Sequence, residues 1–134
     1  MTLHVTLVVP EGEIWAGSAD RVIAKTLDGD VGLLTGHTPV LGILAPGSVV
    51  RILPEDSAGG EWIQAAVGGG FLSVAGDRVS VLARRAALGG EVDKAAARAD
   101  LEAALGDEAA RGQGEESGEI GYLRAQLRAA GDEA

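Results

Sequence analysis

The first part of the chain alternates between short apolar runs and turn residues. In Leu3–Val9 the odd positions are apolar and the even positions mostly polar, a period of two that places one face of a β-strand on a core. Similar runs rich in Val, Ile and Leu recur roughly every ten residues, which is typical of an all-β sandwich or barrel. The predicted strands are residues 3–9, 13–16, 21–27, 31–34, 42–44, 49–53, 61–67, 71–74 and 79–83.

Glycine-containing turns separate these runs and supply the left-handed backbone conformations that tight hairpins need. They are Asp28-Gly29, Pro46-Gly47, Ala58-Gly59-Gly60 and Ala75-Gly76-Asp77. No crossover helix fits between the runs, so a parallel α/β sheet is disfavoured. We therefore expect a mainly β fold, an N-terminal antiparallel β-sandwich of about 8–10 strands over residues 1–86.

The periodicity changes after Ala87. Asp93 is placed to cap a helix that runs to about Arg111, with an apolar residue at every fourth position. The residues of that face are Ala97, Leu101, Leu105 and Ala109. A second predicted helix, residues 119–130, carries Ile120, Leu123, Leu127 and Ala130 on one face. Residues 87–134 are therefore predicted to form a C-terminal α-helical hairpin with a polar connector over 112–118.

This hairpin should depend on a docking surface. Two helices this short are marginal alone in water, and Gly106 adds a cost of about 1 kcal/mol relative to Ala if it lies inside the first. If more than one surface is available, the same tail can fold against either, which is the physical basis of a switch. We expect a regulatory role for this domain.

Charge and composition exclude several functions. Twenty acidic residues against eleven basic ones give a net charge of −9, which disfavours nucleic acids and anionic lipid surfaces as partners. The chain has no cysteine, and His4 and His37 are its two histidines, so disulfides, thiolate chemistry and multi-histidine metal sites are excluded. Residues 31–50 lack charged side chains but contain several Pro and Gly, so we expect strands and turns there and no membrane insertion.

No candidate site points to an enzyme. Gly68-Gly69-Gly70 lacks the following Lys-Ser/Thr of a phosphate loop and precedes a predicted strand, so it indicates a tight turn. His37 lies between strands, where a lone histidine is more often a turn or contact residue than a ligand. Asp28 and Asp30 flank a hairpin glycine without the spacing of a calcium loop. We predict no catalytic residue, no cofactor and no metal.

Three segments, in order, carry a resemblance to a known family. They are 28–41 (DGDVGLLTGHTPVL), 67–74 (VGGGFLSV) and 79–83 (VSVLA). The most specific is the acidic-glycine turn that leads into Gly-His-x-Pro. Together they resemble the epsilon subunit of bacterial F-type ATP synthase, whose members have a β-sandwich followed by a helical hairpin.

The resemblance implies a non-catalytic rotor subunit of a proton-translocating ATP synthase, peripheral at the cytoplasmic face of the bacterial plasma membrane. Its sandwich would contact the gamma subunit and the polar loops of the c-ring. The residues that would face the ring are Asp28, Gly29, Asp30, Gly36 and His37. Asp30 could pair with a basic residue of the ring. That Asp28 and Asp30 serve only to form the turn is an equally open interpretation.

The resemblance also bears on the tail. Many relatives open the first helix with a hydrophobic-Asp-x-x-Arg-Ala motif whose arginine helps to hold ATP; here Asp93 is present but Ala96 stands in the arginine's place, with Arg98 nearby. We therefore expect no nucleotide sensing. Family tails restrain ATP hydrolysis through basic side chains against acidic loops of the alpha/beta catalytic head. Arg124 and Arg128 are the candidates here, in a tail whose net charge of −6 should weaken that contact.

Two other classes of protein stay open at this point. A small ligand- or carbohydrate-binding β-sandwich module could use Trp15 and Trp62 for stacking, although it would leave the hairpin unexplained. A cupin-like metalloenzyme is nearly excluded by the histidine count.

Overall fold

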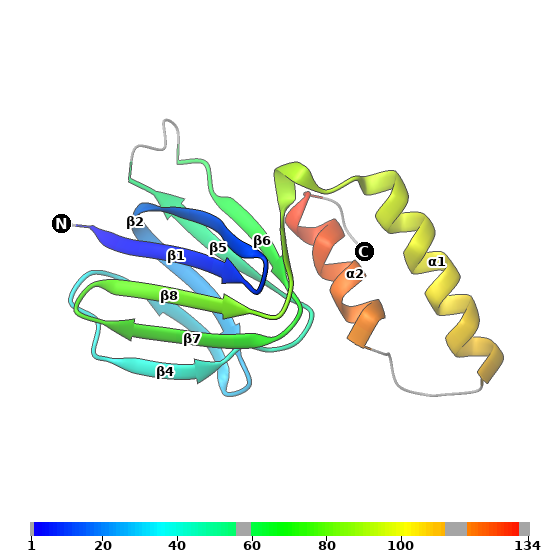
Figure 1. Ribbon diagram of the computed structural model, residues 1–134, viewed down its shortest axis with the longest axis horizontal. Coiled ribbons are helices and arrows are strands. Elements are labelled where there is room, and N and C mark those ends of the chain that lie inside the picture. Colours follow the sequence, from blue (N-terminus) through cyan, green and yellow to red (C-terminus); the bar gives the residue numbers. More distant parts are fainter. Residues whose placement is uncertain (1, 56–59, 112–117, 132–134) are drawn as a thin grey trace.

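The computed structural model describes the chain except for residues 1, 56–59, 112–117 and 132–134, and the predicted turn at Ala58-Gly59 and most of the helix connector therefore lie outside it. Nine strands lie in the described part and form one continuous hydrogen-bonded network that folds into two layers (Figure 1). They are β1 (Leu3–Val9), β2 (Gly12–Thr26), β3 (Gly29–Leu33), β4 (Val40–Ile43), β5 (Ser48–Pro54), β6 (Ile63–Val67), β7 (Gly70–Ala75), β8 (Arg78–Ala83) and β9 (Ala86–Leu88).

The strand order is β4-β7-β8-β1-β2-β5-β6-β9, with β3 paired to β2. Among the described strands all pairs are antiparallel except β1 and β8, which are parallel in the register His4↔Arg78 to Val8↔Leu82. The predicted antiparallel sandwich therefore contains one parallel pair. The chain passes through the other layer between β1 and β8, so no tight turn forces the two strands into opposite directions.

Strand β2 joins the two layers. It is a single strand of 15 residues, where the sequence predicted two strands, 13–16 and 21–27. Its first half pairs with β1, and its second half pairs with β3 and β5. The residues between the two predicted strands are also extended. A Cβ at Gly17 would lie 3.0 Å from the Trp15 ring, which passes over this position.

The core lies between the layers and confirms the predicted alternation. In β1 the odd positions are buried and the even positions exposed or half-buried. Buried residues from β1, β2, β5, β7 and β8 form one cluster, among them Leu3, Leu7, Val22, Ile52, Leu72 and Val81. The β-sandwich predicted from the period of two is therefore present.

Strand β9 was not predicted. It pairs with β6 through Ala65↔Leu88 to Val67↔Ala86 and continues the sheet past the predicted end of the sandwich at Ala86. A strand of three residues is too short to display a period of two. A short 3-10 helix, Gly89–Glu91, follows it.

The two predicted helices are present as α1 (Lys94–Arg111) and α2 (Gly118–Ala129). Asp93 caps α1, because its Oδ1 accepts a hydrogen bond of 3.1 Å from the Ala96 N–H. The helices pack on each other through Ala97, Leu101, Ile120, Leu123 and Leu127.

Leu105 departs from the predicted face of α1, since 37% of its surface is exposed. Helix α1 has 18 residues and α2 has 12, so the last turns of α1 extend beyond α2 (Figure 1). The side chain of Ala109 lies outside the described residues.

The hairpin packs against the sandwich through α2. The contact is made by Tyr122, Ala125 and Ala129 of α2 with Val49 of β5 and Ala66 of β6. Helix α1 lies on the outer side of α2 (Figure 1). The structure thus shows the docking surface that the tail was expected to need.

Candidate interaction surfaces

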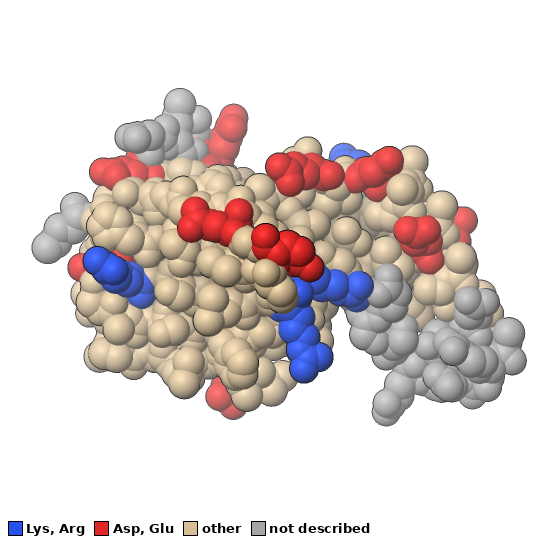
Figure 2. All heavy atoms as spheres, in the orientation of Figure 1, with Lys and Arg blue, Asp and Glu red and all other residues tan. Residues whose placement is uncertain are grey.

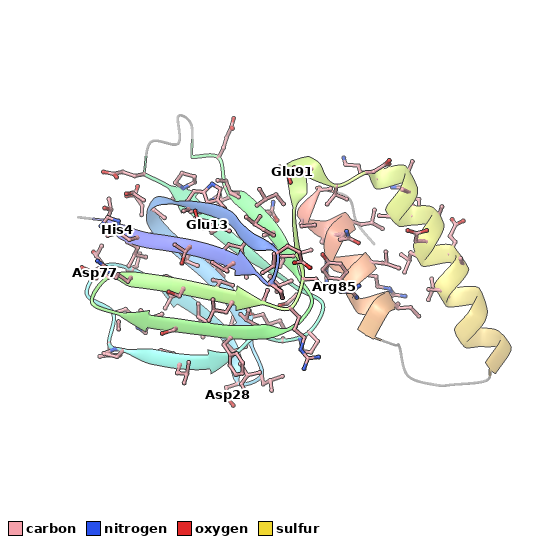
Figure 3. The ribbon with its side chains drawn as sticks, viewed as in Figure 1. His4, Glu13, Asp28, Asp77, Arg85 and Glu91 are labelled. Carbon is pink, nitrogen blue, oxygen red and sulfur yellow. The ribbon has the colours of Figure 1, made fainter. Side chains whose placement is uncertain are left out.

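The acidic turn, Asp28–Asp30, connects β2 to β3 and projects from the sandwich (Figure 3). Thr26 shapes it: its hydroxyl donates to the Gly29 carbonyl at 2.9 Å and accepts from the Asp28 N–H at 3.2 Å. Gly29 has φ +123°, which an L-residue rarely adopts. Both carboxylates are exposed, so the turn presents two negative charges on a fixed backbone.

The loop of Gly36 and His37 leaves the other end of β3. The Gly36 N–H donates to Asp77 Oδ1 at 2.7 Å, which ties the loop to the turn between β7 and β8. The His37 ring donates from Nδ1 to the Thr38 carbonyl at 2.7 Å. Its ring is therefore held by its own loop.

The structure does not bring these two predicted contact elements together. β3 has five residues, so the acidic turn and the Gly36–His37 loop are about 15 Å or more apart along the strand. Figure 3 shows the same separation, with Asp77, which binds the loop, and Asp28 at different ends of the sandwich. The acidic turn and the loop of Gly36 and His37 can share one partner surface only if that surface spans the length of β3.

A row of exposed apolar side chains crosses the outer face of the β4-β7-β8 layer. Ile43 pairs with Phe71, and Phe71 pairs with Leu82, so the three side chains stand beside one another. Half of each is exposed: 52%, 52% and 50%. Leu27, next to the acidic turn, is 64% exposed and lines the same shallow hollow. We call Leu27, Ile43, Phe71 and Leu82 the apolar row.

This face has little charge. Figure 2 shows a broad uncharged area over β7 and β4, with acidic side chains above it and at its lower edge. Arg84 lies at the rim of the hollow. Contiguous exposed apolar surface of this kind marks an interface with another protein, and a rim with few charges suits burial in a complex.

The apolar row was missed at the level of sequence, although a signal exists. In β7 and β8 apolar residues occupy both phases of the alternation: Leu72 and Val81 point inward, and Phe71 and Leu82 point outward. A strand that is apolar on both faces is covered on both faces. Since the structure covers one face, the other is available for a partner.

The predicted basic residues of the tail are dispersed. Arg98 is exposed on α1, and Arg124 is half-buried on α2. Arg128, in the last turn of α2, donates from Nη2 to the Gly47 carbonyl at 2.8 Å. In this docked state Arg128 is therefore engaged with the sandwich.

Two further contacts fasten α2 to the sandwich. The guanidinium of Arg85 lies 3.9 Å from the centre of the Tyr122 ring (Figure 3 labels Arg85 at this junction), a cation–π contact. Gly47 faces Gly121 so closely that a Cβ on Gly47 would lie 2.6 Å from the Gly121 carbonyl carbon. Sequence reasoning found neither contact, because each joins a residue of the sandwich to a residue of α2, far away in the sequence.

Other kinds of site are not supported. Within the described ranges, no group of three or more His, Cys, Asp or Glu residues is placed to hold a metal ion. None of the helices described is both long and apolar enough to cross a bilayer. Trp15 packs against the sandwich core, which removes it from the stacking role that a carbohydrate-binding module would require.

Comparison with known proteins agrees with this architecture. Residues 2–89 match the sequence model of the family "ATP synthase, Delta/Epsilon chain, beta-sandwich domain". The ATP synthase epsilon chain of Thermobifida fusca is 50% identical over 129 residues, which cover 96% of this chain and 91% of that protein. The epsilon chain of Frankia casuarinae is 51% identical over 88 residues, 66% of this chain but 99% of that relative. The second relative is thus about as long as the segment matched by the family.

Two solved structures contain chains with a similar fold. A chain in the mitochondrial ATP synthase of Euglena gracilis, determined as the OSCP/F1/c-ring assembly, superposes with a TM-score of 0.74 and 27% identity, covering 96% of this chain and 81% of that chain. A chain in the central stalk and c-ring of Tetrahymena thermophila shares the fold, with a TM-score of 0.56 and 20% identity over 69% of this chain and 71% of that chain.

Proposed function

Because the chain belongs to the family of ATP synthase delta/epsilon chains, we propose that it is a non-catalytic rotor subunit whose sandwich links the gamma subunit to the c-ring. The apolar row is the observation that carries this proposal. An accessory subunit needs a stable contact surface and no reactive groups, and the outer face of β4, β7 and β8 has that character. No observation favours the carbohydrate-binding alternative.

The apolar row is the surface we assign to the gamma subunit. Three of its side chains come from β4, β7 and β8, and Leu27 directly follows β2, so the sheet fixes their relative positions. Buried aromatic side chains near the centre of an interface contribute most of its binding energy. Phe71, between Ile43 and Leu82 in the row, is the expected centre.

Substituting Phe71→Asp tests this assignment. A carboxylate in the middle of a desolvated interface removes a contact worth about 2 kcal/mol or more, so binding to the gamma subunit should weaken by at least about 30-fold. Co-purification and titration with gamma measure the effect. Leu34→Asp is the matched control, because Leu34 is also 50% exposed but follows β3, outside the row. Equal gamma affinity for Phe71→Asp and the unmodified chain would refute the assignment.

The acidic turn is the surface we assign to the c-ring. It projects as a rigid hairpin end with two exposed carboxylates, which suits basic residues in short polar loops. The Gly36–His37 loop lies at the other end of β3, so it would reach the ring only through a second contact. We therefore base the ring contact on Asp28, Gly29 and Asp30.

Reversing one charge separates contact from simple turn formation. Asp30→Lys keeps the turn, since Gly29 and Thr26 form it, but removes a charge-assisted hydrogen bond worth about 1.5–3 kcal/mol. Proton-driven ATP synthesis in reconstituted vesicles should fall while the sandwich stays folded. As a control, Asp20→Lys makes the same charge change at an exposed acid of β2, away from the acidic turn. Unchanged synthesis with Asp30→Lys would leave Asp30 with a turn-forming role alone.

We propose that these contacts would hold the protein, through the ring, at the cytoplasmic face of the bacterial plasma membrane. The hairpin is the proposed regulatory element: when it leaves the sandwich, Arg124 and Arg128 become available to acidic loops of the alpha/beta catalytic head. The contact of Arg128 with Gly47 in the docked state supports a choice between two partners for the same side chain.

A further inference from the structure

The apolar row covers only part of the surface that a stable complex buries. A specific interface takes about 800 Å² from each partner, whereas the row consists of four side chains that are half or more exposed. The row also lies at one end of its strands: Ile43 is the last residue of β4, Phe71 the second of β7 and Leu82 the last but one of β8. Along these strands a larger contact can therefore extend in one direction, away from the hairpin (Figure 1).

Leu41 lies in that direction on the same face. It comes two residues before Ile43 in β4 and pairs with Ser73 of β7. With 78% of its surface exposed, it is the most exposed large apolar side chain among the described residues. The same rung of the sheet continues through Ser80 to Thr6, whose small side chains leave the face flat. An apolar group in this position indicates that the contact continues past the row.

The next rung ends the uncharged area with basic groups. Arg78, the first residue of β8, pairs with His4 of β1, and both side chains are exposed. Figure 2 shows a basic side chain at the left end of the uncharged area, where β8 begins in Figure 1. Arg78 is four residues from Leu82, about 13 Å along the strand, which lies well within an interface of standard size. Asp77, the acidic neighbour of Arg78, accepts a hydrogen bond from the Gly36 N–H.

A hollow of about 360 Å³ lies at this end of the face. None of its described lining residues is acidic, and its polar side chains can all donate hydrogen bonds. Within the described part of the chain, the Arg78 guanidinium and the Thr6 and Ser80 hydroxyls make no hydrogen bond or ion pair. The hollow thus offers a cation and two hydroxyl donors to a partner. Its lining consists of His4, Thr6, Arg78, Val79 and Ser80.

We propose that the gamma contact extends from the apolar row past Leu41 to Arg78, and that a carboxylate of the gamma subunit binds the Arg78 guanidinium in this hollow. The inference rests on the assignment of the apolar row to gamma. A guanidinium that a partner covers needs a counter-charge, because an unpaired buried charge is strongly unfavourable. Arginine binds carboxylates bidentately, and the hydroxyls of Thr6 and Ser80 can donate to the same oxygens.

A cation at one end of the contact and apolar groups at the other fix the orientation of the partner. If gamma docked the opposite way round, its carboxylate would lie on Phe71 and an apolar group would cover Arg78. Both mismatches are unfavourable, so one orientation is selected. Phe71 then supplies binding energy, and Arg78 determines specificity.

The test measures the affinity of the full chain for the gamma subunit. Arg78→Gln should weaken binding about 10-fold, as expected for the loss of one charge-assisted contact. Arg78→Glu should weaken it at least about 100-fold, because two carboxylates then face each other. The matched control is Arg21→Glu, which makes the same charge change at an exposed arginine of β2 that pairs with β5 in the other layer. It should leave the affinity unchanged, and circular dichroism should show that all variants are folded.

Leu41→Asp tests the middle of the extended contact. Leu41 is exposed on an edge strand, so its replacement leaves the sandwich core intact. A carboxylate here would be desolvated by gamma, and binding should weaken at least about 10-fold.

Charge exchange identifies the partner group. Each Asp and Glu of gamma is replaced by Lys in turn, and every gamma variant is titrated with the Arg78→Glu chain and with the unmodified chain. One gamma variant should bind the Arg78→Glu chain at least about 10-fold more tightly than unmodified gamma does, and should bind the unmodified chain more weakly.

The outcomes separate this inference from the proposed function. Equal gamma affinity for Arg78→Glu and the unmodified chain, an equal loss with Arg21→Glu, or no restoring gamma variant would overturn the carboxylate contact. An unchanged affinity for Leu41→Asp would overturn the extension along β4. If these results came with weaker binding by Phe71→Asp, the apolar row would remain the gamma surface. If Phe71→Asp also had no effect, the assignment of the row would fail as well.

Discussion

Glycine 47 shows what a single residue contributes to this molecule. It has φ +67° in the turn before β5, and α2 passes directly over it. The sequence predicted a turn at Pro46-Gly47 from local chemistry alone. It could not predict the second role, because the space above Gly47 is limited by Gly121 of α2, which the fold brings there from far away in the sequence.

Gly47→Ala should loosen the hairpin. The left-handed conformation costs a residue with a Cβ about 1–2 kcal/mol, and the new methyl group would also lie 2.6 Å from the Gly121 carbonyl carbon. We expect exchange of the α2 amides to become at least about 10-fold faster. Gly76→Ala supplies the control, since Gly76 has φ +55° and no neighbour of its Cβ position within 4 Å. If both variants change α2 exchange equally, close packing at Gly47 is unimportant.

At the scale of elements, periodicity predicts the buried face of a helix only when the helix has a single buried face. The stripe of Ile120, Leu123 and Leu127 was predicted and packs on α1. Helix α2 has a second buried face, formed by Tyr122, Ala125 and Ala129 against the sandwich. Because alanines make up most of it, this face carried no strong apolar signal.

Two leucines on the same stripe of α1 should differ in effect. Leu101 is 7% exposed and packs on α2, whereas Leu105 is 37% exposed beyond the end of that helix. Leu101→Ala should destabilise the hairpin by about 2 kcal/mol or more, as for buried leucines elsewhere. Leu105→Ala, the same chemical change, should cost well under half as much. Hydrogen exchange of α1 compares the two, and equal losses would contradict the described packing.

At the scale of the whole molecule, a firmly packed sandwich carries a weakly attached hairpin. The sandwich core comes from five or more strands, whereas the hairpin meets it through one face of α2 and a few specific contacts. Motifs in the sandwich were sufficient to suggest the family. The apolar row was not predicted, because it arises from residues that only the sheet pairing brings together.

Removing the second helix should change regulation and leave assembly intact. A chain that ends at Gly118 keeps the sandwich and the apolar row, and the Frankia casuarinae relative, of which 88 residues are 99% of the length, indicates that a chain of sandwich length is viable. We expect the assembled complex to hydrolyse ATP faster, because the proposed inhibitory contact of the second helix is lost. The increase should be modest, about two-fold, since the negative charge of the tail already weakens its contact with an acidic surface. Arg124→Gln with Arg128→Gln in the full chain should reproduce this increase. No increase in hydrolysis at low salt, where charge contacts are strongest, would argue against tail inhibition.

Strand β2 also has a mechanical consequence. It ends at the acidic turn and runs without interruption through both layers, bonded to β1, β3 and β5 along its 15 residues. Ladder hydrogen bonds of antiparallel strands lie across the strand direction, so a pull on the turn shears many of them simultaneously instead of opening them one by one. Force received at this hairpin would therefore be shared by most of the sandwich, which lets a body of this size pass on torque without unravelling.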